Sequence, residues 1–442
     1  MEKIDTIVIG AGVAGLTAAR LLAQAGQAVL LLEARNRIGG RTYTERAEGF
    51  TTDRGASWIH GIDENPLTAV VKDFGMRSAE FTVGSYQALS RPIAYYGPTG
   101  QRLSEEASQG FANDISDFDH HLAGSISASV LGSTYAEAIE ETLNTLDWDA
   151  QRTERVREFL HHRSEEQYGV CAKQLDAHGL DDDSVQGDEV VFPDGFDQLA
   201  AHLAMGLDIR LGHEVRRVEW STDGVQVHTT QGEFSASRVV VTVPVGILKS
   251  DDFVFSPALP APLSDALAGF EMNNFEKVFL RFAHKFWDDD VYVIRRQGEA
   301  GKWWHSWYDL TDLHGVPTLL TFAAGPSAIE TRAWSDDRIA VSVLESLRGI
   351  YGDRVEAPEH VLITNWQDDP HSRGSYAYMK PGSVPEDHDL LATPVGGVLH
   401  LAGEATWGED PATVTAALRS GHRAAENILG QRLSFGTLAA PL

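Results

Sequence analysis

Residues 4–33, IDTIVIGAGVAGLTAARLLAQAGQAVLLLE, decide the fold class of this chain. The β-branched run 6–9 predicts a short strand, and the glycines that follow it predict a tight turn. The apolar, alanine-rich stretch Leu16–Ala25 predicts a helix that Gly26 stops, and Ala28–Leu32 predicts a second, buried strand. Strand, turn, helix and strand together predict a βαβ unit at the start of an α/β fold.

The glycine turn has the spacing of a dinucleotide-binding site. Gly10, Gly12 and Gly15 follow a strand and open a helix, so backbone N–H groups and the positive helix end can meet a pyrophosphate. Glu33, at the end of the next strand, is placed to accept a hydrogen bond from a ribose 2′-OH. A purely structural glycine turn is the alternative. The fingerprint alone does not distinguish FAD from NAD.

Two further segments favour a long, bent flavin cofactor. The run EARNRIGGR at 33–41 supplies guanidinium groups and a flexible glycine pair that suit two additional phosphate charges. Near the other end of the chain, AGEAT at 402–406 precedes a helix that we expect to start at Pro411 and to run to about Leu429. Its positive end would face the flavin, with Thr413 and Val414 as donors. An ordinary proline-initiated helix is the alternative.

Length, composition and charge set the broad class. A chain of 442 residues with 43% apolar and 23% charged residues is typical of a soluble enzyme of two domains. The net charge of −28 would repel nucleic acid and anionic lipid and would attract a cationic substrate, although such acidity also simply favours solubility.

Cysteine usage and the start of the chain narrow the class further. Cys171 is the single cysteine, so a disulfide within the chain and a CxxC pair are excluded, and with them the disulfide reductases. Met1 to Lys3 run directly into an apolar strand without a signal-peptide pattern, and no long apolar span follows, which predicts a cytoplasmic protein without membrane contact.

The rest of the chain predicts a second domain interleaved with the first. Residues 105–167 have helical periods, with helices expected at Tyr135–Leu146 and Arg152–His162. Strands are expected at 214–215, 225–227, 238–243, 278–282, 303–308, 318–322 and 397–401. We expect a Rossmann-type FAD-binding domain made of 1–75, 190–255 and 385–442, and an α+β substrate-binding domain made of 76–189 and 256–384.

These segments together resemble the flavin amine oxidase family over most of the chain. The resemblance is carried by the opening fingerprint, RIGGR at 37–41, GASWIHG at 55–61 with NPL at 65–67, VTVPVGILK at 241–249, Lys277, Trp366, GSY at 374–376 and AGEAT at 402–406. The WIHG text is most similar to FAD-dependent polyamine and spermine oxidases.

The resemblance implies a FAD domain of the glutathione-reductase type, a substrate domain that roofs the flavin, and noncovalent FAD. Ser375 stands where monoamine oxidases carry the cysteine that links the flavin. The predicted cofactor contacts are Gly10, Gly12, Gly15, Glu33, Arg35, Gly40, Arg41, Val215, Glu404, Thr413 and Val414.

The resemblance also assigns the reaction centre. Lys277 matches the lysine that reaches flavin N5 through a water, Tyr376 matches one wall of the aromatic cage before the flavin, and His60 matches an active-site histidine of polyamine oxidases. Without the resemblance, the alternative interpretations are a surface lysine for Lys277 and a hydrogen-bonded structural histidine for His60. The expected substrate pocket adds Trp58, Trp366, Thr413 and Trp407.

Several positions leave alternatives open. Thr413 replaces the second aromatic wall, so the cage would be half-open, which favours a longer substrate. Trp366 is equally a core residue. Asp188 and Glu189 are candidates for binding a distal ammonium, with a solvated acidic loop as the preferred interpretation. Trp407 and the pair Trp303-Trp304 are candidates for reshaping the entrance. The adjacent histidine pairs at 120–121 and 161–162 lack metal-ligand spacing, so no metal site is predicted.

The sequence therefore predicts a FAD-dependent amine oxidase that prefers polyamine-type substrates. A hydride would pass from the amine α-carbon to flavin N5, the imine would be hydrolysed, and dioxygen would reoxidise the flavin to give hydrogen peroxide. An L-amino acid oxidase, with Arg54 or Arg373 binding the carboxylate, and a primary monoamine oxidase are the alternatives. A flavin-binding scaffold or chromatin-directed demethylase is a third, for which this chain shows no basic tail or coiled-coil arm. Composition and motifs leave the oligomeric state open.

Overall fold

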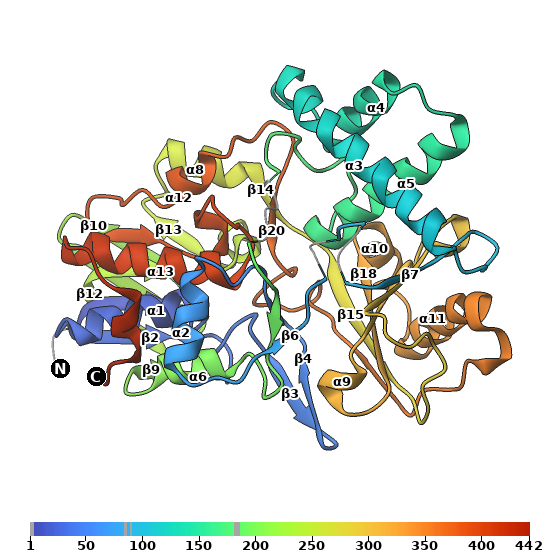
Figure 1. Cartoon of the computed structure of the whole chain (residues 1–442). Coiled ribbons are helices and arrows are strands. Elements are labelled where there is room, and N and C mark those ends of the chain that lie inside the picture. Colours follow the sequence, from blue (N-terminus) through green and yellow to red (C-terminus); the bar gives the residue numbers. More distant parts are fainter. Residues whose placement is uncertain (1–3, 84–85, 89–90, 181–185) are drawn as a thin grey trace.

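The computed structural model describes residues 4–83, 86–88, 91–180 and 186–442, and it places two sheets side by side with helices around them (Figure 1). Strand β1 (Ile4–Ile9), helix α1 (Val13–Gln24) and strand β2 (Val29–Leu32) form the predicted opening unit, and β1 and β2 pair in parallel. The βαβ prediction is confirmed. Helix α1 begins at Val13, three residues before the predicted start, because the glycine turn itself makes its first turn.

The first sheet collects strands from three distant parts of the chain. Its order is β13-β10-β11-β12-β1-β2-β9, with β21 paired in parallel to β12. These strands are β9 (Asp208–Arg210), β10 (Val215–Ser221), β11 (Gly224–Thr229), β12 (Gly232–Val241), β13 (Val254–Ser256) and β21 (Leu399–Leu401). Strand β12 pairs in parallel with β1, so its end at Val241 lies at the same edge of the sheet as the glycine turn that follows β1.

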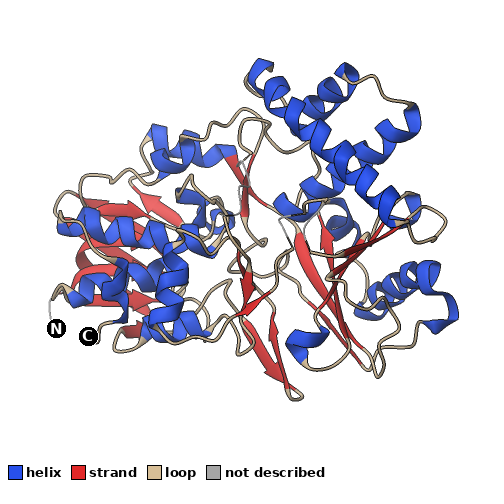
Figure 2. Cartoon of the chain, viewed as in Figure 1, coloured by secondary structure: helices blue, strands red, loops and turns tan. Residues whose placement is uncertain are grey.

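Helices α1 and α13 (Val414–Leu429) pack closely beside this sheet (Figure 2). A Cβ at Gly421 would lie 2.1 Å from the carbonyl oxygen of Ala14, so the two helices can approach this closely only because residue 421 is glycine. The close packing brings the start of α13 next to the glycine turn, although the two segments are about 400 residues apart in the sequence.

The second sheet has the order β19-β15-β18-β17-β16-β7. It consists of β7 (Ile93–Tyr96), β15 (Phe275–Arg281), β16 (Val293–Arg296), β17 (Ser306–Asp309), β18 (Thr318–Ala324) and β19 (His360–Ile363). In the antiparallel pair of β15 and β18, Lys277 lies opposite Phe322. Every residue of β18 is buried, and side chains of α11 (Asp336–Tyr351) belong to the same hydrophobic core as this sheet.

Three helices form a separate layer above the second sheet (Figure 1). They are α3 (Glu105–Ala128), α4 (Tyr135–Thr145) and α5 (Ala150–Tyr168). Side chains of Ser104, Thr134 and Asp149 cap their N-termini, which fixes where each helix begins. Helix α5 continues six residues beyond the predicted end and stops at Gly169, whose φ of 68° suits glycine.

Short elements connect the sheets and helices. They are β3 (Thr44–Ala47), β4 (Phe50–Asp53), β5 (Trp58–Ile59), β6 (Ala79–Glu80), β8 (Val190–Val191), β14 (Phe270–Met272), β20 (Ala377–Met379), α2 (Pro66–Asp73), α6 (Gln198–Ala204), α7 (Val245–Leu248), α8 (Ala261–Gly269), α9 (Thr311–His314), α10 (Pro326–Thr331) and α12 (Asp387–Leu391), with 3-10 turns at Glu299–Gly301, Gly352–Arg354, Glu404–Thr406 and Phe435–Ala439. None of the helices in the described part of the chain is both long and apolar enough to span a membrane.

Other predicted boundaries are also wrong. The last helix starts at Val414 and not at Pro411, because Asp410 and Ala412 have positive φ values of 48° and 64° that a helix does not accommodate, and Thr413 caps the helix by accepting from Ala416 N–H. The strand expected at 303–308 begins only at Ser306. The boundaries of the two domains stay a prediction.

Candidate active site

A cavity of about 960 Å³ lies between the two sheets. Its lining begins at the glycine turn after β1, passes the loops 33–42 and 53–65, and ends at β15, β18 and the C-terminal end of α5. The start of α13 and the segment 370–379 close the other side. The cavity therefore collects the segments that the sequence singled out for the cofactor and the substrate.

The three glycines of the turn have different tasks. Gly10 has a φ of 103°, and a Cβ there would lie 2.6 Å from the hydroxyl oxygen of Thr242. Gly12 lines the cavity, and among the described residues no heavy atom lies within 4 Å of where its Cβ would be, so its missing side chain leaves room for a ligand. A Cβ at Gly15 would lie 1.9 Å from the Gly10 carbonyl oxygen. Gly15 therefore allows helix and strand to pack, it is outside the described cavity lining, and its contact with the cofactor stays a prediction.

Glu33 lines the cavity and also fixes the turn. Its carboxylate accepts the backbone N–H of Ala11 and of Arg35, both at 2.8 Å, and the residue is 4% exposed. Arg35 in turn forms an ion pair of 2.5 Å with Asp369 and donates to the Ser372 hydroxyl at 2.8 Å. The predicted ribose contact and its neighbour are thus held rigidly at the edge of the cavity.

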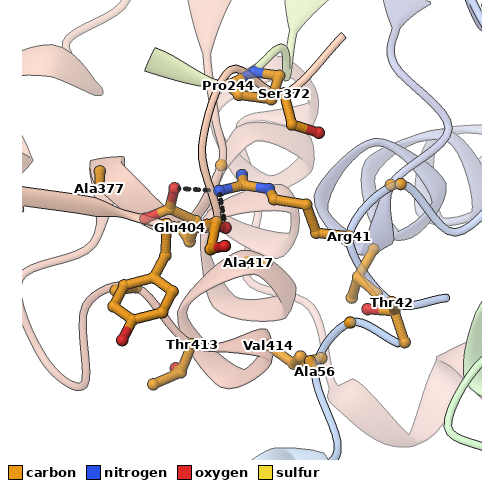
Figure 3. A pocket seen from close by; sticks show the side chains of 18 of the residues that line it. Arg41, Thr42, Ala56, Pro244, Ser372, Ala377, Glu404, Thr413, Val414 and Ala417 are labelled. Atoms are coloured by element: carbon orange, nitrogen blue, oxygen red, sulfur yellow. Dashed lines mark hydrogen bonds and ion pairs between the residues drawn. The ribbon is translucent and has the colours of Figure 1, made fainter. Parts of the chain in front are cut away.

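Arg41 and Glu404 connect the two ends of the cofactor region, as Figure 3 shows. An Nη atom of Arg41 lies 2.7 Å from Glu404 Oε1 and 3.1 Å from the Ser375 carbonyl oxygen. The second oxygen, Glu404 Oε2, is buried and has no partner among the described residues. A buried carboxylate oxygen without a donor costs free energy, so this atom is suited to a hydrogen bond from a bound group. Gly40 and Val215 line the same region, as predicted for cofactor contacts.

The N-termini of α1 and α13 both face the cavity. The N-cap Gly12 has no side chain to cap α1, and neither helix has an acidic residue in its first turn. The Thr413 hydroxyl accepts from Ala416 N–H at 3.0 Å, and Thr413 and Val414 both line the cavity. Two positive helix ends without acidic side chains suit a ligand with a pyrophosphate at one end and an electron-rich ring at the other.

Lys277 on β15 is 7% exposed, and the loop after β4 surrounds its ammonium group. Lys277 Nζ donates to the carbonyl oxygens of Asp53 at 3.1 Å and Gly55 at 2.6 Å, and to the Ser57 hydroxyl oxygen at 2.5 Å. Burial lowers the pKa of Lys277 to about 8, although the Asp53 carboxylate opposes this shift. Burial raises the pKa of Asp53 to about 6. Lys277 is therefore an interior lysine and not a surface one.

His60 and Glu189 form a pair that the sequence interpretation missed. His60 Nδ1 makes a hydrogen bond with Glu189 Oε1, and Glu189 Oε2 accepts the Val83 N–H at 2.6 Å. His60 lines the cavity, and Glu189 is 0% exposed, so the interpretation of this position as a solvated acidic loop is wrong. The pairing of β5 with β8, which no local sequence pattern specifies, brings His60 and Glu189 opposite each other. Asp188 instead points to the surface beside Arg91.

An aromatic wall runs from Tyr376 away from the cofactor end. The Tyr376 ring centroid lies 5.7 Å from that of Phe275, Phe275 lies 4.7 Å from Phe322, and Phe322 lies 5.2 Å from Tyr308. All four rings line the cavity. The wall leads to Glu166 of α5, whose side chain is 5% exposed and lines the cavity.

Glu166 has polar neighbours on two sides. The Tyr308 hydroxyl donates to its Oε2 at 2.5 Å, and His305 Nε2 lies 3.0 Å from its Oε1. Burial raises the pKa of Glu166, and the nearby Arg295 guanidinium opposes this shift. No distinct sequence signal marks this residue, because it is one of four glutamates in helix α5.

The predicted pocket tryptophans separate into two groups. Trp58 and Trp366 line the cavity, and their indole N–H groups donate to the carbonyl oxygens of Phe81 and Arg54. Trp407 lies outside the lining, where the guanidinium groups of Arg419 and Arg423 pack over its ring at 5.5 and 4.8 Å. The place of Trp407 in the substrate pocket stays a prediction.

The pair Trp303-Trp304 is also outside the cavity lining. Trp304 is 1% exposed and donates to the Ser342 hydroxyl at 2.9 Å, which makes it a core residue of the second sheet. A role at the substrate entrance is therefore not supported for it.

One group of potential metal ligands lies next to the cavity. Ligand atoms of His162, Glu165 and His305 lie within 4.8 Å of one another. The two imidazole rings stack with centroids 3.7 Å apart and an angle of 11° between their planes. Lone pairs in parallel ring planes do not converge on one ion, and Arg295 adds a positive charge, so the geometry does not suit a metal.

The chain resembles known proteins in sequence. The model of the flavin-containing amine oxidoreductases matches residues 13–429. The chain is 31% identical to lysine-specific histone demethylase 1 homolog 1 of Oryza sativa subsp. japonica, covering 96% of this chain and 52% of that protein. It is also 31% identical to polyamine oxidase 2 of Arabidopsis thaliana, covering 96% of this chain and 87% of that protein. The chain thus spans about half the length of the demethylase relatives.

Solved structures show the same fold. A structure of putrescine oxidase with bound putrescine superimposes with a TM-score of 0.80 at 23% identity and covers 97% of this chain and 99% of that one. The predicted α/β fold with a Rossmann-type part is therefore confirmed. The glycine cradle, the two helix N-termini without acidic residues in their first turns and the unpartnered Glu404 oxygen fit the cofactor of this family. The chain belongs to the flavin-containing amine oxidoreductases, and its cofactor is FAD.

Proposed function

We propose that this protein oxidises polyamine-type amines with noncovalent FAD and dioxygen as electron acceptor. FAD, when bound, takes the hydride of the amine α-carbon and passes the electrons on to dioxygen. The residues of the chain hold the cofactor, orient the amine and control protons. Ser375 and the absence of a thiol in the cavity lining support a noncovalent cofactor, since the Ser375 hydroxyl donates to the Phe275 carbonyl oxygen at 2.6 Å.

The main support for a polyamine substrate is the position of Glu166, whose buried carboxylate lies at the end of the aromatic wall. A buried carboxylate is costly unless it meets donors or a cation, and its raised pKa reflects this cost. An extended amine with its reacting end beside Tyr376 would place methylene groups along Phe275 and Phe322 and a second ammonium at Glu166. The similarity to a polyamine oxidase over 96% of this chain supports the same substrate class.

The reacting nitrogen must be neutral when it loses a hydride from the neighbouring carbon. Tyr376 is held by the hydrogen bond of its hydroxyl to the Gln167 carbonyl oxygen at 3.0 Å, so its ring is a fixed wall for the amine. Lys277, with a pKa of about 8, and His60, which is paired with Glu189, are titratable groups that line the same cavity. Activity should therefore rise with pH as the substrate ammonium loses its proton.

The amino acid oxidase alternative needs a free cation for the substrate carboxylate. Both predicted arginines line the cavity, but each is already paired: Arg54 with Glu45 and Arg373 with Asp252. Arg54 also donates to the Ile363 carbonyl oxygen at 3.1 Å. A carboxylate ligand would have to displace an existing ion pair, which makes this alternative less favourable. A simple monoamine would fill the aromatic region and bring no second ammonium group to Glu166.

A demethylase is the second candidate function, because relatives of 31% identity carry this name. Its substrate would be a methylated lysine side chain of a peptide, which also offers an amine on an apolar stem. The two candidates differ in what lies beyond the reacting nitrogen, since a polyamine ends in a second ammonium and a peptide does not.

An anaerobic substrate screen tests the proposal. Purified holoenzyme is mixed with spermine, putrescine, butylamine, leucine and a dimethyl-lysine peptide, and the loss of flavin absorbance is followed in time. The proposal expects bleaching by at least one polyamine with a rate at least about 10-fold above that for butylamine, because one charged hydrogen bond contributes about 1.5–3 kcal/mol. Preferential bleaching by leucine or by the peptide would contradict the proposed substrate class.

A further inference from the structure

The Lys277 ammonium group is fully occupied by the loop after β4. An ammonium has three N–H bonds, and Lys277 Nζ has three acceptors: the Asp53 and Gly55 carbonyl oxygens and the Ser57 hydroxyl oxygen. Two of these acceptors are backbone carbonyls that cannot pass a proton on. Lys277 and Ser57 both line the cavity, and of the three acceptors of Nζ only the Ser57 hydroxyl can pass a proton on to a group there.

The Ser57 hydroxyl is built to connect Lys277 with the cavity. Ser57 lines the cavity, and its Oγ lies 2.5 Å from Lys277 Nζ. Its other contacts within the loop are long, at 3.5 Å to the Asp53 carbonyl oxygen and 3.4 Å to the Gly55 carbonyl oxygen, and Lys277 already donates to both oxygens. The hydroxyl proton is thus weakly held by the loop whenever Oγ accepts from the ammonium.

We propose that Ser57 is the group through which Lys277 acts on the cavity: its hydroxyl donates into the cavity when Lys277 is protonated and accepts from the cavity when Lys277 is neutral. This inference rests on the role of Lys277 in the proposed function. In the first state Oγ accepts from Nζ and its own proton points outward. In the second state the hydroxyl donates to the Nζ lone pair, and an Oγ lone pair is left for a donor in the cavity.

The arrangement also conducts a proton. As a water or amine nitrogen in the cavity takes the Ser57 hydroxyl proton, an N–H bond of Lys277 breaks and a new O–H bond forms on Oγ. The serine is unchanged, Lys277 has lost one proton, and the acceptor has gained it; no electrons are transferred. The reverse direction carries a proton from a substrate ammonium to a neutral Lys277.

Few charged groups surround this unit. On the β4 side the Asp53 carboxylate is held by the Thr44 hydroxyl and the Phe196 N–H and favours the protonated lysine. Arg54 next to it is neutralised by Glu45.

The remaining neighbours of Lys277 are a second acid and uncharged groups. On β15, Glu276 is engaged by the Thr364 hydroxyl and the Gln367 N–H. From β5, Trp58 lies with its ring centroid 5.6 Å from Nζ and is followed by His60, which is paired with Glu189. From β18, the residue opposite Lys277 is the uncharged Phe322. Lys277 is thus the group whose protonation changes the charge beside Ser57 near pH 8.

The test uses holoenzyme of the wild type, Ser57→Ala, Ser57→Thr, Lys277→Met and the double variant Ser57→Ala/Lys277→Met. A first readout needs no turnover: the absorbance spectrum of oxidised bound flavin is titrated between about pH 6 and pH 10. We expect a spectral step centred near pH 8 in the wild type and in Ser57→Thr. The step should be absent in Lys277→Met and at least about threefold smaller in Ser57→Ala, which keeps the lysine but lacks the hydroxyl.

The second readout is a double-mutant cycle on the rate of anaerobic flavin reduction. We expect Ser57→Ala and Lys277→Met each to slow reduction at least about 10-fold, and the double variant to be no more than about twofold slower than Lys277→Met, because the two groups act as one unit. Ser57→Thr should stay within about threefold of the wild type. Additive effects, or a Ser57→Ala enzyme with wild-type rate and spectral step, would overturn the proposal.

The design separates the possible failures. If Lys277→Met reduces its flavin at the wild-type rate, the role of Lys277 in the proposed function fails; if only Ser57→Ala behaves as wild type, the inference about Ser57 fails alone. Thermal unfolding and FAD affinity are measured for each variant. Should Ser57→Ala not fold, Ser57→Cys replaces it, because a thiol keeps the size but is a weak donor and acceptor, and the same slow rate and reduced step are expected.

Discussion

Replacement of Glu166 by glutamine removes the buried negative charge at the end of the aromatic wall with little change in shape. In the wild type the carboxylate accepts from the Tyr308 hydroxyl at 2.5 Å, and a glutamine carbonyl oxygen can accept the same bond. What is lost is the charge that would meet the second ammonium of a polyamine. A hydrogen bond to a charged group contributes about 1.5–3 kcal/mol, so KM or Kd for spermine and putrescine should rise about 10- to 150-fold.

The monoamine serves as the internal reference for this variant. Butylamine does not reach a second charge, so its kcat/KM should stay within about threefold. Glu158→Gln is the matched control variant: Glu158 lies on the same helix, accepts the Gly298 N–H at 2.6 Å, and is outside the cavity lining. It should leave the ratio of polyamine to monoamine activity unchanged. Kd values come from the spectral change of the flavin on anaerobic mixing, and KM and kcat from peroxide production.

Stability distinguishes lost recognition from lost folding. Burial raises the pKa of Glu166, so this group favours the folded state below its unfolded pKa, and that contribution is lost as pH rises through the raised folded pKa. Glutamine does not ionise, so Glu166→Gln does not lose this stabilisation as the pH rises. Its thermal midpoint without substrate should therefore equal or exceed that of the wild type at pH 8. Unchanged polyamine affinity in this variant, or an equal loss for butylamine, would refute the assignment of Glu166.

Three further predictions follow from other parts of the structure. Gly12→Ala should leave the thermal midpoint of the FAD-free protein unchanged but weaken FAD binding at least about 10-fold, because the added methyl group enters the open cavity. Gly15→Ala should lower the free energy of unfolding by at least about 1–3 kcal/mol, because its Cβ overlaps a carbonyl oxygen of the turn. Urea unfolding and FAD titration measure these effects, and equal stabilities of the two variants would contradict the packing role of Gly15. Asp53 has a raised pKa of about 6, so its ionisation costs the wild type up to roughly 3 kcal/mol of stability as pH rises from 4 to 7, and Asp53→Asn should remove this cost. The same variant should lower the pKa of Lys277 below 8, because the Asp53 carboxylate raises it. A difference in unfolding free energy between the two proteins that does not change over this pH range would contradict the prediction. Trp407→Phe should lower the thermal midpoint and leave the KM ratio of spermine to butylamine within about twofold, and a changed ratio would return Trp407 to the substrate site.

The parts of the site that sequence could predict are those with local signatures. The glycine turn, Glu33 and the start of the last helix have spacings that follow from how a backbone binds phosphate, so their place at the cavity was predictable. Lys277 and Tyr376 were found only through the resemblance to a family, because a lysine in a strand has no signature of its own. The predicted helix start at Pro411 is wrong because Asp410 before it and Ala412 after it have positive φ values, which the composition of the segment does not reveal.

The parts that could not be predicted depend on contacts between distant segments. Glu166 is one of four glutamates in a charged helix, and only the contacts of α5 with β18 and with Tyr308 of β17 show that it is buried. Glu189 is buried because β8 pairs with β5 and β6, a register that no local pattern specifies. The position of Trp407 in the sequence between Glu404 and Thr413 does not show that its ring packs against Arg423.

In the proposed complex FAD lies extended from the glycine turn to the start of α13, with its ring between Lys277 and Tyr376. A crystal structure of the protein with FAD and a nonreactive diamine measures this directly. We expect the pyrophosphate at Gly12, the flavin ring beside Lys277 and Tyr376, and the distal ammonium within hydrogen-bond distance of Glu166. A flavin ring away from these two side chains, or a protein that remains colourless after incubation with FAD, would contradict it.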